Sequence, residues 1–426
     1  MSIMTKASAV RSRSLKASIA TGAVVASLAL VLSGCSTPST GGDGGGKQDL
    51  ALKIGTALPQ TGNLAFLGPP EEAGVAYAAS LISDASKDTG LTLDVVYGDS
   101  GDTDNKAYET EIPRLLGEKV SAIIGAASSG TSLQFIDQVV GAGVIQFSPA
   151  NTSDAFSTYD DNGLYFRTAP SDVLQGQVLG NLIAEDGNAT LGLIVLNDSY
   201  GTGLAKYVTA AFEKAGGKVV AAPTYNTGDT SFTSQISEVL AADPDAIALI
   251  TFDEVKTILP GLFGKFDASK LYFVDGNLAN FGDLFAAGSL TGAKGTLPGL
   301  SIDSIGDFTG QLDDFLKSTG GKPLDDYSYA AESFDATTLI ALAALAAGST
   351  DGKDIAAKLQ EVSGGSGDGE KCTSYADCAK IIVGGGVADY DGISGPITFD
   401  EVGDPTEASV GIYQYGEDNN YSAYNG

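Results

Sequence analysis

The chain has 426 residues, in which 53 Asp and Glu face 24 Lys and Arg, and it contains no histidine. A formal net charge of −29 makes nucleic acid and anionic lipid surfaces unsuitable partners. The lack of histidine excludes Ser-His-Asp and Cys-His catalysis and every histidine-based metal site, so we expect neither a metal nor another cofactor.

Residues 1–34 have the pattern of a secretory signal, with basic residues, no acid and then the apolar run ASIATGAVVASLALVL. The run leads into Leu-Ser-Gly-Cys at 32–35, which resembles the lipobox of bacterial lipoproteins, and we therefore expect Cys35 to carry lipid. The alternatives are an ordinary signal peptide that holds a cysteine, or a membrane helix, for which the run is short. Residues 35–49 are rich in Gly, Ser and Thr and predict a flexible tether.

The stretch LPQTG, residues 58–62, matches the LPxTG tag of cell-wall sorting enzymes. Such a tag works near the C-terminus, ahead of an apolar stretch and a basic tail. Here more than 360 residues follow it, and the last of them read GEDNNYSAYNG. We therefore expect LPQTG to form a loop between a strand and a helix.

From residue 50 onward, short apolar strands alternate with helices of about a dozen residues. Strands are predicted at 50–58, 91–100, 120–128 and 144–151, with helices at 69–86, 105–119 and 132–143 between them. The pattern restarts with helices at 173–187, 201–217, 230–244 and 254–266 and strands at 190–198, 218–226, 245–252 and 270–277. This alternation predicts two α/β lobes, each a doubly wound parallel sheet with helices on both faces.

The last third of the chain changes character. Residues 327–348 predict a long apolar helix, whose alanine-rich stretch is short for a membrane span and suits core packing. Residues 394–405 and 408–416 predict a closing β-hairpin. Between these segments lie Cys372 and Cys378, which outside the cytoplasm are expected to form a disulfide around a small loop, since a zinc site would need two more soft ligands.

Eight segments in order resemble a known family, the extracytoplasmic solute-binding proteins of ABC transporters, and within it the branched-chain amino acid (Leu/Ile/Val) group. They are IGTALPQTGNLAFLG, VVYGDSGDT, AIIGAASSGTS, QFSPANTSD, IVLNDSYGTG, GDTSFTSQISEV, YAAESFDATTLIALA and DYDGISGPITFDEVGD. The resemblance runs from about residue 50 to the last residues. It implies a binding protein without catalysis, which captures a solute, delivers it to ABC permease subunits and works as a monomer. A lipid anchor suits such a protein on the outer face of the cytoplasmic membrane in a Gram-positive organism.

The resemblance also implies the type I periplasmic-binding-protein fold, in which three crossovers join two lobes that close on the ligand. The crossovers are expected near Ala169–Asp172, Leu297–Ser301 and Ile393–Pro396. Lobe 1 would then hold residues 50–169 and 300–394, and lobe 2 would hold residues 170–299 and 395–426.

In the first lobe the resemblance implies a site for the carboxylate of the solute. The turn GAASSGTS would offer backbone N–H groups at Ser128 and the hydroxyl of Ser129, at the start of a helix. Thr152 would add further donors, and Asn151 stands where a small residue is common. The alternative is that Ser129 and Thr152 only cap their helices.

In the second lobe Asp275, in FVDGN, is expected to pair with the ammonium group of the solute. Close relatives commonly have the acid one position later, where this chain has Gly276, and the alternative is a solvated turn aspartate. Tyr200, in NDSYGTG, would reach the cleft from the same lobe, or else pack against the start of its helix.

Leu67, with Phe66 beside it, stands where relatives place an aromatic residue against the solute side chain. This change leaves room for a bulkier or different solute. Phe252, Asp253 and Glu254 follow a strand of the second lobe and would line the pocket, although acids in that place commonly cap a helix.

Two further hypotheses remain open. The nearer one keeps the fold but replaces the amino acid by an amide, urea or an aromatic acid. The other is a surface hydrolase that uses two carboxylates about 5 to 10 Å apart across a cleft. The sequence holds many acids but singles out no such pair.

Overall fold

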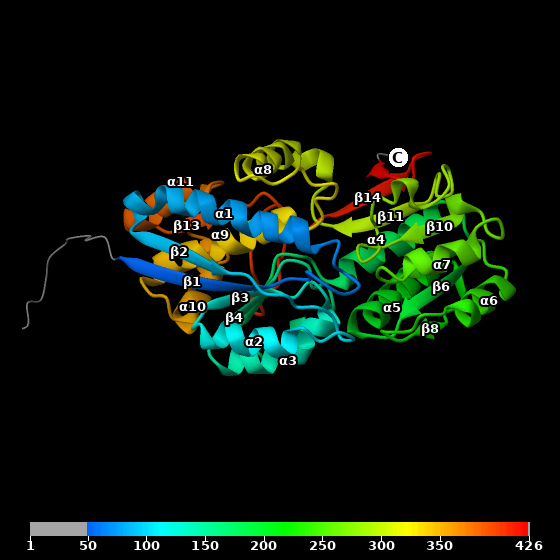
Figure 1. Cartoon of the computed structure of the whole chain (residues 1–426), viewed down its shortest axis with the longest axis horizontal. Coiled ribbons are helices and arrows are strands. Elements are labelled where there is room, and N and C mark those ends of the chain that lie inside the picture. Colours follow the sequence, from blue (N-terminus) through cyan, green and yellow to red (C-terminus); the bar gives the residue numbers. More distant parts are fainter. Residues whose placement is uncertain (1–48, 425–426) are drawn as a thin grey trace, which may run out of the picture. The chain divides into compact units, whose positions relative to one another are not determined.

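The computed structural model describes residues 49–424, so the predicted signal, Cys35 and nearly all of the tether lie outside the described residues. The first of its main sheets is five-stranded and parallel throughout, in the order β2-β1-β3-β4-β5 (Figure 1). Its strands are β1 (Leu50–Ala57), β2 (Leu91–Val96), β3 (Ala122–Gly125), β4 (Ile145–Ser148) and β5 (Tyr165–Arg167).

The second main sheet follows the order β15-β14-β11-β10-β9-β6-β7, with β8 paired to β6. All its pairings are parallel except those of β14 with β11 and with β15. Its strands are β6 (Thr190–Leu196), β7 (Lys218–Ala221), β8 (Thr224–Tyr225), β9 (Ala246–Ile250), β10 (Leu271–Phe273), β11 (Lys294–Pro298), β14 (Val410–Tyr415) and β15 (Tyr421–Ala423). Every residue of the apolar strands β3 and β9 is buried, as parallel strands covered on both faces require.

Helices cover both faces of each sheet, and the predicted pair of α/β lobes is confirmed. Around the first sheet lie α1 (Gly68–Thr89), α2 (Tyr108–Gly117), α3 (Ser129–Gly141), α9 (Ala330–Ala347), α10 (Gly352–Val362) and α11 (Tyr375–Val383). Around the second lie α4 (Asp172–Glu185), α5 (Ser199–Lys214), α6 (Thr233–Ala241) and α7 (Val255–Leu262). In Figure 1, α2 and α3 lie on the opposite side of the first sheet from α1.

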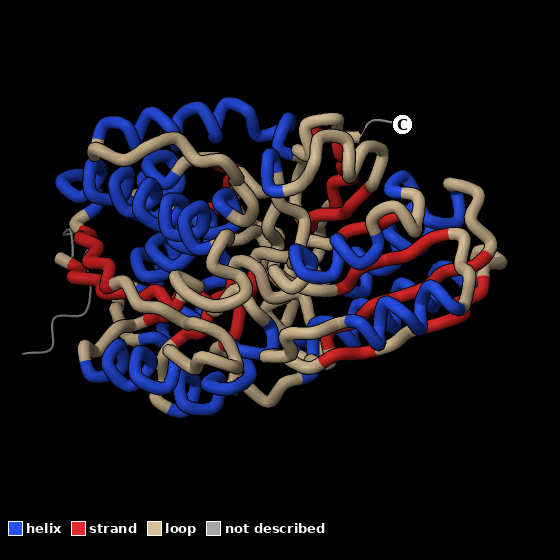
Figure 2. Tube along the Cα trace, turned by 45° about the vertical axis from the view of Figure 1, so that its right-hand side comes forward, coloured by secondary structure: helices blue, strands red, loops and turns tan. Residues whose placement is uncertain are grey.

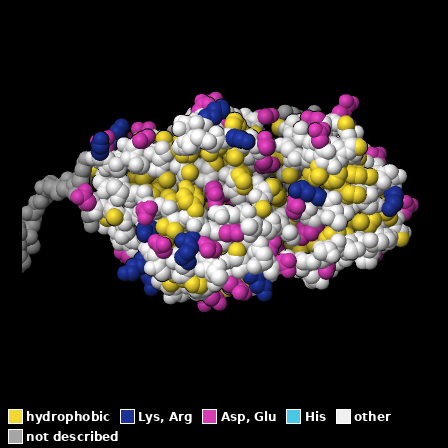
Figure 3. Space-filling model, in the orientation of Figure 1, with side chains coloured by type: hydrophobic (Ala, Val, Ile, Leu, Met, Phe, Trp, Pro, Cys, Tyr) yellow, Lys and Arg dark blue, Asp and Glu magenta, His cyan; other side chains and the backbone are white. Residues whose placement is uncertain are grey.

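The remaining elements are short or peripheral. Helix α8 (Gly306–Ser318) packs against α1. The 3₁₀ turns are η1 (Phe156–Thr158), η2 (Ala268–Lys270), η3 (Gly282–Leu284) and η4 (Ile302–Ile305), and the parallel pair β12 (Glu370–Cys372) and β13 (Ala388–Tyr390) forms a separate small sheet. On the face seen in Figure 3, Lys and Arg side chains are scattered among acidic ones and form no basic patch.

The LPQTG stretch lies in the loop between β1 and α1, as predicted. The Asp99 carboxylate holds this loop by accepting hydrogen bonds from the backbone N–H groups of Gln60 (3.0 Å) and Thr61 (3.1 Å) and from the Thr61 hydroxyl (2.6 Å). Helix α1 then begins at Gly68 with two prolines in its first turn and ends at Thr89, and the following Gly90 has a φ of 77°, which suits a glycine C-cap. The loop thus joins two elements of the first lobe.

Helix α9 corresponds to the apolar helix predicted at 327–348 and packs in the core, as expected. It contacts α1, α10 and α11. Within residues 49–424, it is the only helix long and apolar enough to cross a membrane, but 83% of its apolar window is buried inside the protein. The apolar character of α9 is therefore explained by packing in the first lobe.

The predicted hairpin of 394–405 with 408–416 is wrong. Instead, β14 pairs with β15, and residues 394–405 form only isolated bridges. Phe399 packs edge-on against Phe147 and Phe166 of the first lobe, and Ile397 belongs to the same core. The third crossover therefore follows this segment, rather than lying near Ile393–Pro396 as predicted.

A buried ion pair anchors this segment to the first lobe. Arg167 has no exposed side-chain surface, and its Nε and Nη2 atoms donate to the two carboxylate oxygens of Asp404, at 2.6 and 2.7 Å. The chain joins the second sheet at Val410, so residues 395–404 belong with lobe 1 and not with lobe 2. Of the other two predicted crossovers, Ala169–Asp172 lies between β5 and the first residue of α4, and Leu297–Ser301 lies at the end of β11 and in the loop that follows.

The predicted bond between Cys372 and Cys378 is present, with the Cys378 side chain fully buried in the first lobe. Because the bond closes a loop of six residues' separation, chain entropy predicts a contribution of about 2–3 kcal/mol to the free energy of unfolding. We expect the double variant Cys372→Ser/Cys378→Ser to lose about this amount in urea unfolding monitored by circular dichroism. Reduced wild-type protein should match the variant, and equal stability of the oxidised and reduced forms would contradict the prediction.

Candidate functional site

The loops that follow the strands of both sheets meet in the centre of the described chain (Figure 2). Ligands of open α/β sheets bind at these carboxyl ends. A cavity of about 10 Å³ lies there, between the two lobes. The residues that line it are Leu64, Leu67, Ala127, Ser128, Ser129, Ala150, Tyr200, Phe252, Asp275, Gly276 and Tyr329.

Most of the residues singled out from the sequence meet at this cavity: Leu67, Ser128, Ser129, Tyr200, Phe252 and Asp275. Asn151 and Thr152 do not line it, and both are fully buried behind its wall. The amide nitrogen of Asn151 donates to the carbonyl oxygens of Ala126 (3.0 Å) and Ala127 (2.7 Å), and the carbonyl of Thr152 accepts from the N–H of Asp172 (2.6 Å). These two residues therefore support the wall, and Ala150 faces the cavity in their place.

Asp275 is the only carboxylate among the residues that line the cavity, and it is 5% exposed. Its Oδ1 accepts hydrogen bonds from the Tyr200 hydroxyl (2.7 Å) and from Gln175 Nε2 (2.9 Å), and its Oδ2 accepts from the Tyr329 hydroxyl (2.8 Å). Burial raises the pKa of Asp275, and these donors partly offset that rise because they stabilise the charged form. A cation in the cavity would relieve the remaining cost of burying the charge.

Sequence reasoning missed Tyr329, which precedes α9 and reaches Asp275 across the junction of the lobes. Its backbone has φ 60° and ψ 10°, a left-handed conformation that is uncommon for a bulky residue. Such outliers cluster at ligand sites, where the surrounding structure holds them in place. Tyr329 is the first residue of the motif YAAESFDATTLIALA, which carried part of the family resemblance. Nothing in the sequence, however, places this tyrosine opposite Asp275.

On the opposite wall, the N-terminus of α3 faces the cavity through Ser128 and Ser129. Ser128 caps the helix, since its Oγ accepts from the N–H of Thr131 (3.2 Å), and Ser129 Oγ accepts from the N–H of Ser153 (3.3 Å). A helix N-terminus presents N–H groups and partial positive charge, which suit a carboxylate. The two serines thus act in the fold as well as lining the cavity.

Direct hydrogen bonds hold the two lobes together around the cavity. Asn63 Nδ2 donates to Glu254 Oε1 (2.7 Å), and the Ser153 hydroxyl donates to the carbonyl of Ser199 (3.1 Å). Glu254 also accepts from the Tyr225 hydroxyl (3.1 Å), and Asp253 pairs with Lys256, so neither acid lines the cavity as the sequence suggested. The structure therefore has its lobes in contact, and the Glu254 carboxylate takes part in that contact.

The cavity is small and apolar on most sides. A volume of about 10 Å³ holds about one water molecule, so a larger ligand can enter only when the lobes part. The ring of Phe252 stacks on that of Tyr200, with centroids 5.1 Å apart. Among residues 49–424, no group of three or more Cys, Asp or Glu side chains is placed to hold a metal ion.

The sequence model of a family described as "Periplasmic binding protein" matches residues 51–372. The "leucine-, isoleucine-, valine-, threonine-, and alanine-binding protein" of Pseudomonas aeruginosa is 30% identical over 193 residues, which are 45% of this chain and 51% of that protein, so the match spans about half of that relative. The "Leu/Ile/Val-binding protein homolog 1" of Brucella abortus is 23% identical over 89% of this chain and 94% of its own length.

Solved structures have the same fold. A branched-chain amino acid transporter substrate-binding protein of Streptococcus pneumoniae, solved with isoleucine, has a TM-score of 0.68 and 20% identity, and the match covers 88% of this chain and 99% of that one. At this identity the likeness concerns the fold alone. These relatives are named as solute-binding proteins rather than enzymes, in agreement with the expectation of binding without catalysis.

Proposed function

This chain belongs to the periplasmic binding protein family and has the type I fold of that family, and from this premise we propose that it is the substrate-binding protein of an ABC importer. Its solute is a branched-chain or similar apolar amino acid, captured between the two lobes and handed to the permease. The protein acts as a monomer, held by lipid on Cys35 at the outer face of the cytoplasmic membrane. The lipobox-like end of the signal supports the anchor.

One observation supports an amino acid as the solute: the cavity has a buried carboxylate on one side and a helix N-terminus on the other. Asp275 supplies the negative charge for an ammonium group, and the start of α3 at Ser128 and Ser129 supplies donors for a carboxylate. A zwitterion between them would neutralise both walls. Asp275 belongs to the second lobe and α3 to the first, so one bound solute would tie the lobes together.

The rest of the lining suits an aliphatic side chain. Leu64, Leu67, Ala127 and Ala150 offer apolar surface, and Phe252 adds a ring face. Burying an aliphatic side chain of the size of Leu or Val among such residues contributes about 1.5–3 kcal/mol. A charged or strongly polar side chain would find no partner on this wall.

A thermal-shift screen of residues 48–426 tests this function. At a concentration one hundred times its dissociation constant, a solute that binds only the folded protein adds about 2.7 kcal/mol of stability, and we expect the melting temperature to rise by roughly 3–4 °C with leucine, isoleucine or valine. The panel includes an amide, urea and an aromatic acid. A shift with one of these and with no amino acid would keep the fold and overturn the proposed solute.

A further inference from the structure

A second and larger cavity lies beside the one already described. Its volume is about 500 Å³, which is in the range of small-molecule sites. Its walls come from α1 in the first lobe, from α7 and the loop after β10 in the second, and from the segment 322–326 that precedes α9. Phe66 lines this outer cavity, and its neighbour Leu67 lines the inner one, so a single loop borders both.

One part of the outer cavity is apolar. Phe66, Pro69 and Pro70 contribute from the β1–α1 loop and the start of α1, and Phe281 and Leu284 contribute from the second lobe. The Leu284 side chain is 55% exposed, the most of the exposed large apolar residues in the described chain. Apolar surface gathered in a concave site favours a partner with an apolar group.

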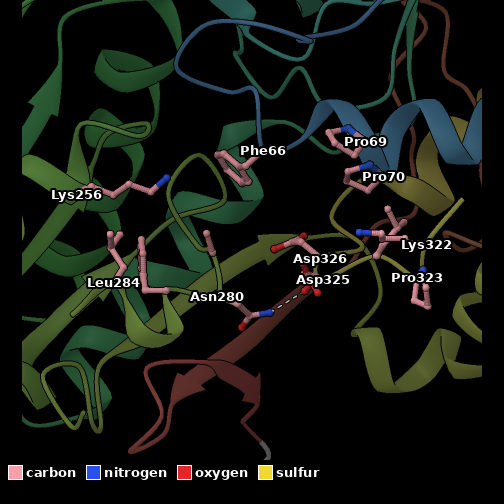
Figure 4. A pocket seen from close by; sticks show the side chains of 13 residues that line it. Phe66, Pro69, Pro70, Lys256, Asn280, Leu284, Lys322, Pro323, Asp325 and Asp326 are labelled. Carbon is pink, nitrogen blue, oxygen red and sulfur yellow. Dashed lines mark hydrogen bonds between the residues drawn. The ribbon is translucent and has the colours of Figure 1, made fainter. Parts of the chain in front are cut away.

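The other part carries charges of both signs. Figure 4 shows the side chains of Lys256 and Lys322 directed into the cavity from opposite walls, with Asp325 and Asp326 between them. Lys256 also pairs with Asp253, so a solute carboxylate would share its ammonium group with that acid. Lys322 is exposed and makes no hydrogen bond or ion pair with any residue of 49–424. Asp326 is held in place, since its carboxylate accepts from the N–H of Ser328 (2.8 Å) and from the Tyr421 hydroxyl (3.1 Å).

We propose that the outer cavity is a second solute site, which takes a zwitterion with an apolar side chain. The carboxylate of this molecule meets Lys256 and Lys322, its ammonium group meets Asp325 and Asp326, and its side chain lies on Phe66 and the prolines. A simple anion would meet the two acids, and a simple cation would meet the two lysines, so a molecule with both charges fits the walls best. The inference rests on the proposed function, because it assigns the same class of solute to both cavities.

The position of the outer cavity gives the second molecule an effect on closure. Lys256 lies on α7 of the second lobe, whereas Pro69 and Pro70 lie on α1 of the first. The cavity is therefore complete only when the lobes are together, and a molecule bound there favours that arrangement. Binding at the outer site and binding at the inner site are therefore coupled through the relative placement of the lobes, and the coupling acts equally in both directions.

Isothermal titration of residues 48–426 with L-leucine, L-isoleucine and L-valine, each in turn, measures the stoichiometry. We expect two molecules per chain, the second bound more weakly. In the double variant Lys256→Gln/Lys322→Gln, the weaker site should lose at least tenfold in affinity while the stronger site remains. Lys214→Gln removes an exposed lysine at the end of α5 and serves as the matched control, in which both sites should persist.

Asp275→Asn separates this inference from the proposed function. It should remove the inner site and leave the outer one, whereas the lysine variants should do the reverse. One molecule per chain, lost in Asp275→Asn and unchanged in the double lysine variant, would overturn the second site and leave the proposed function standing. Binding that the lysine variants abolish and Asp275→Asn preserves would keep the outer site and overturn the inner one, and no binding of any of the three amino acids would overturn both.

Discussion

Replacing Asp275 by asparagine is expected to weaken the binding of leucine, isoleucine or valine by roughly 30- to 4000-fold. Truncating one partner of a buried, hydrogen-bonded charge pair costs about 2–5 kcal/mol, because the other charge is left buried without compensation. Asparagine has the shape of aspartate, and its Oδ1 can still accept from the Tyr200 hydroxyl while its Nδ2 donates to the hydroxyl oxygen of Tyr329, so the walls of the cavity should stay in place. Isothermal titration measures the change.

The unliganded variant gives the control on folding. Burial already raises the pKa of Asp275, so removing its charge should not destabilise the fold, and the melting temperature without solute should stay within a few degrees of wild type. Asp243→Asn is the matched substitution outside the site, because Asp243 is exposed after α6 and its φ of 50° suits asparagine. Unchanged affinity in Asp275→Asn would contradict the ammonium role.

The lobes could be predicted because the pattern of the sequence is local. Alternating apolar strands and amphipathic helices specify parallel sheets with covered faces, and β3 and β9 are buried at every residue as that pattern requires. The LPQTG loop followed from the same reasoning, since a strand precedes it and a helix with two prolines in its first turn follows.

The third crossover could not be predicted, because contacts distant in sequence decide it. Residues 394–405 alternate as a strand would, yet Phe399 is buried against Phe147 and Phe166, and Asp404 pairs with Arg167. Each partner is more than 200 residues away along the chain. Packing against the first lobe therefore determines the conformation of residues 394–405, although their local sequence favours a strand.

The candidate site likewise contains some residues that the sequence predicted correctly and others that it did not. Residues directly after strands, such as Ser128, Tyr200 and Asp275, reach the cavity because the carboxyl ends of parallel strands share one edge. Asn151 and Thr152 also follow a strand, but they turn into the wall, and the neighbouring Ala150 faces the cavity. Tyr329 precedes the first turn of α9 and follows no strand, so a rule about strand ends could not have found it.

Glu332 is a buried acid in the first turn of α9, and its burial predicts that the stability of the protein depends on pH. Its side chain is nearly all buried, and burial first, then the charge of Asp335, raises its pKa to about 8. Glu71 of α1 faces the same region, its carboxylate oxygens have no hydrogen-bond partner within residues 49–424, and burial raises its pKa well above the ordinary value. Asp335 itself is held by the Tyr390 hydroxyl and by Ser394.

The direction of the pH dependence follows from the raised pKa of Glu332. Below the ordinary glutamate pKa of about 4.5, Glu332 is protonated in both the folded and the unfolded chain, so its ionisation takes nothing from the free energy of unfolding. As the pH rises from there towards 8, only the folded chain keeps the proton, so the free energy of unfolding falls. A shift of this size corresponds to a loss of about 3–5 kcal/mol by pH 8.

We therefore expect Glu332→Gln to be more stable than wild type at pH 8, by about 3–5 kcal/mol, and equally stable near pH 4.5. Glutamine keeps the shape of the side chain and cannot ionise, so the fall in stability between these pH values should shrink in the variant. Urea unfolding at half-unit pH steps measures the slope for each protein. Glu213→Gln, an exposed glutamate on α5, should leave the slope unchanged, and the same slope in Glu332→Gln as in wild type would show that this carboxyl ionises freely in the folded protein.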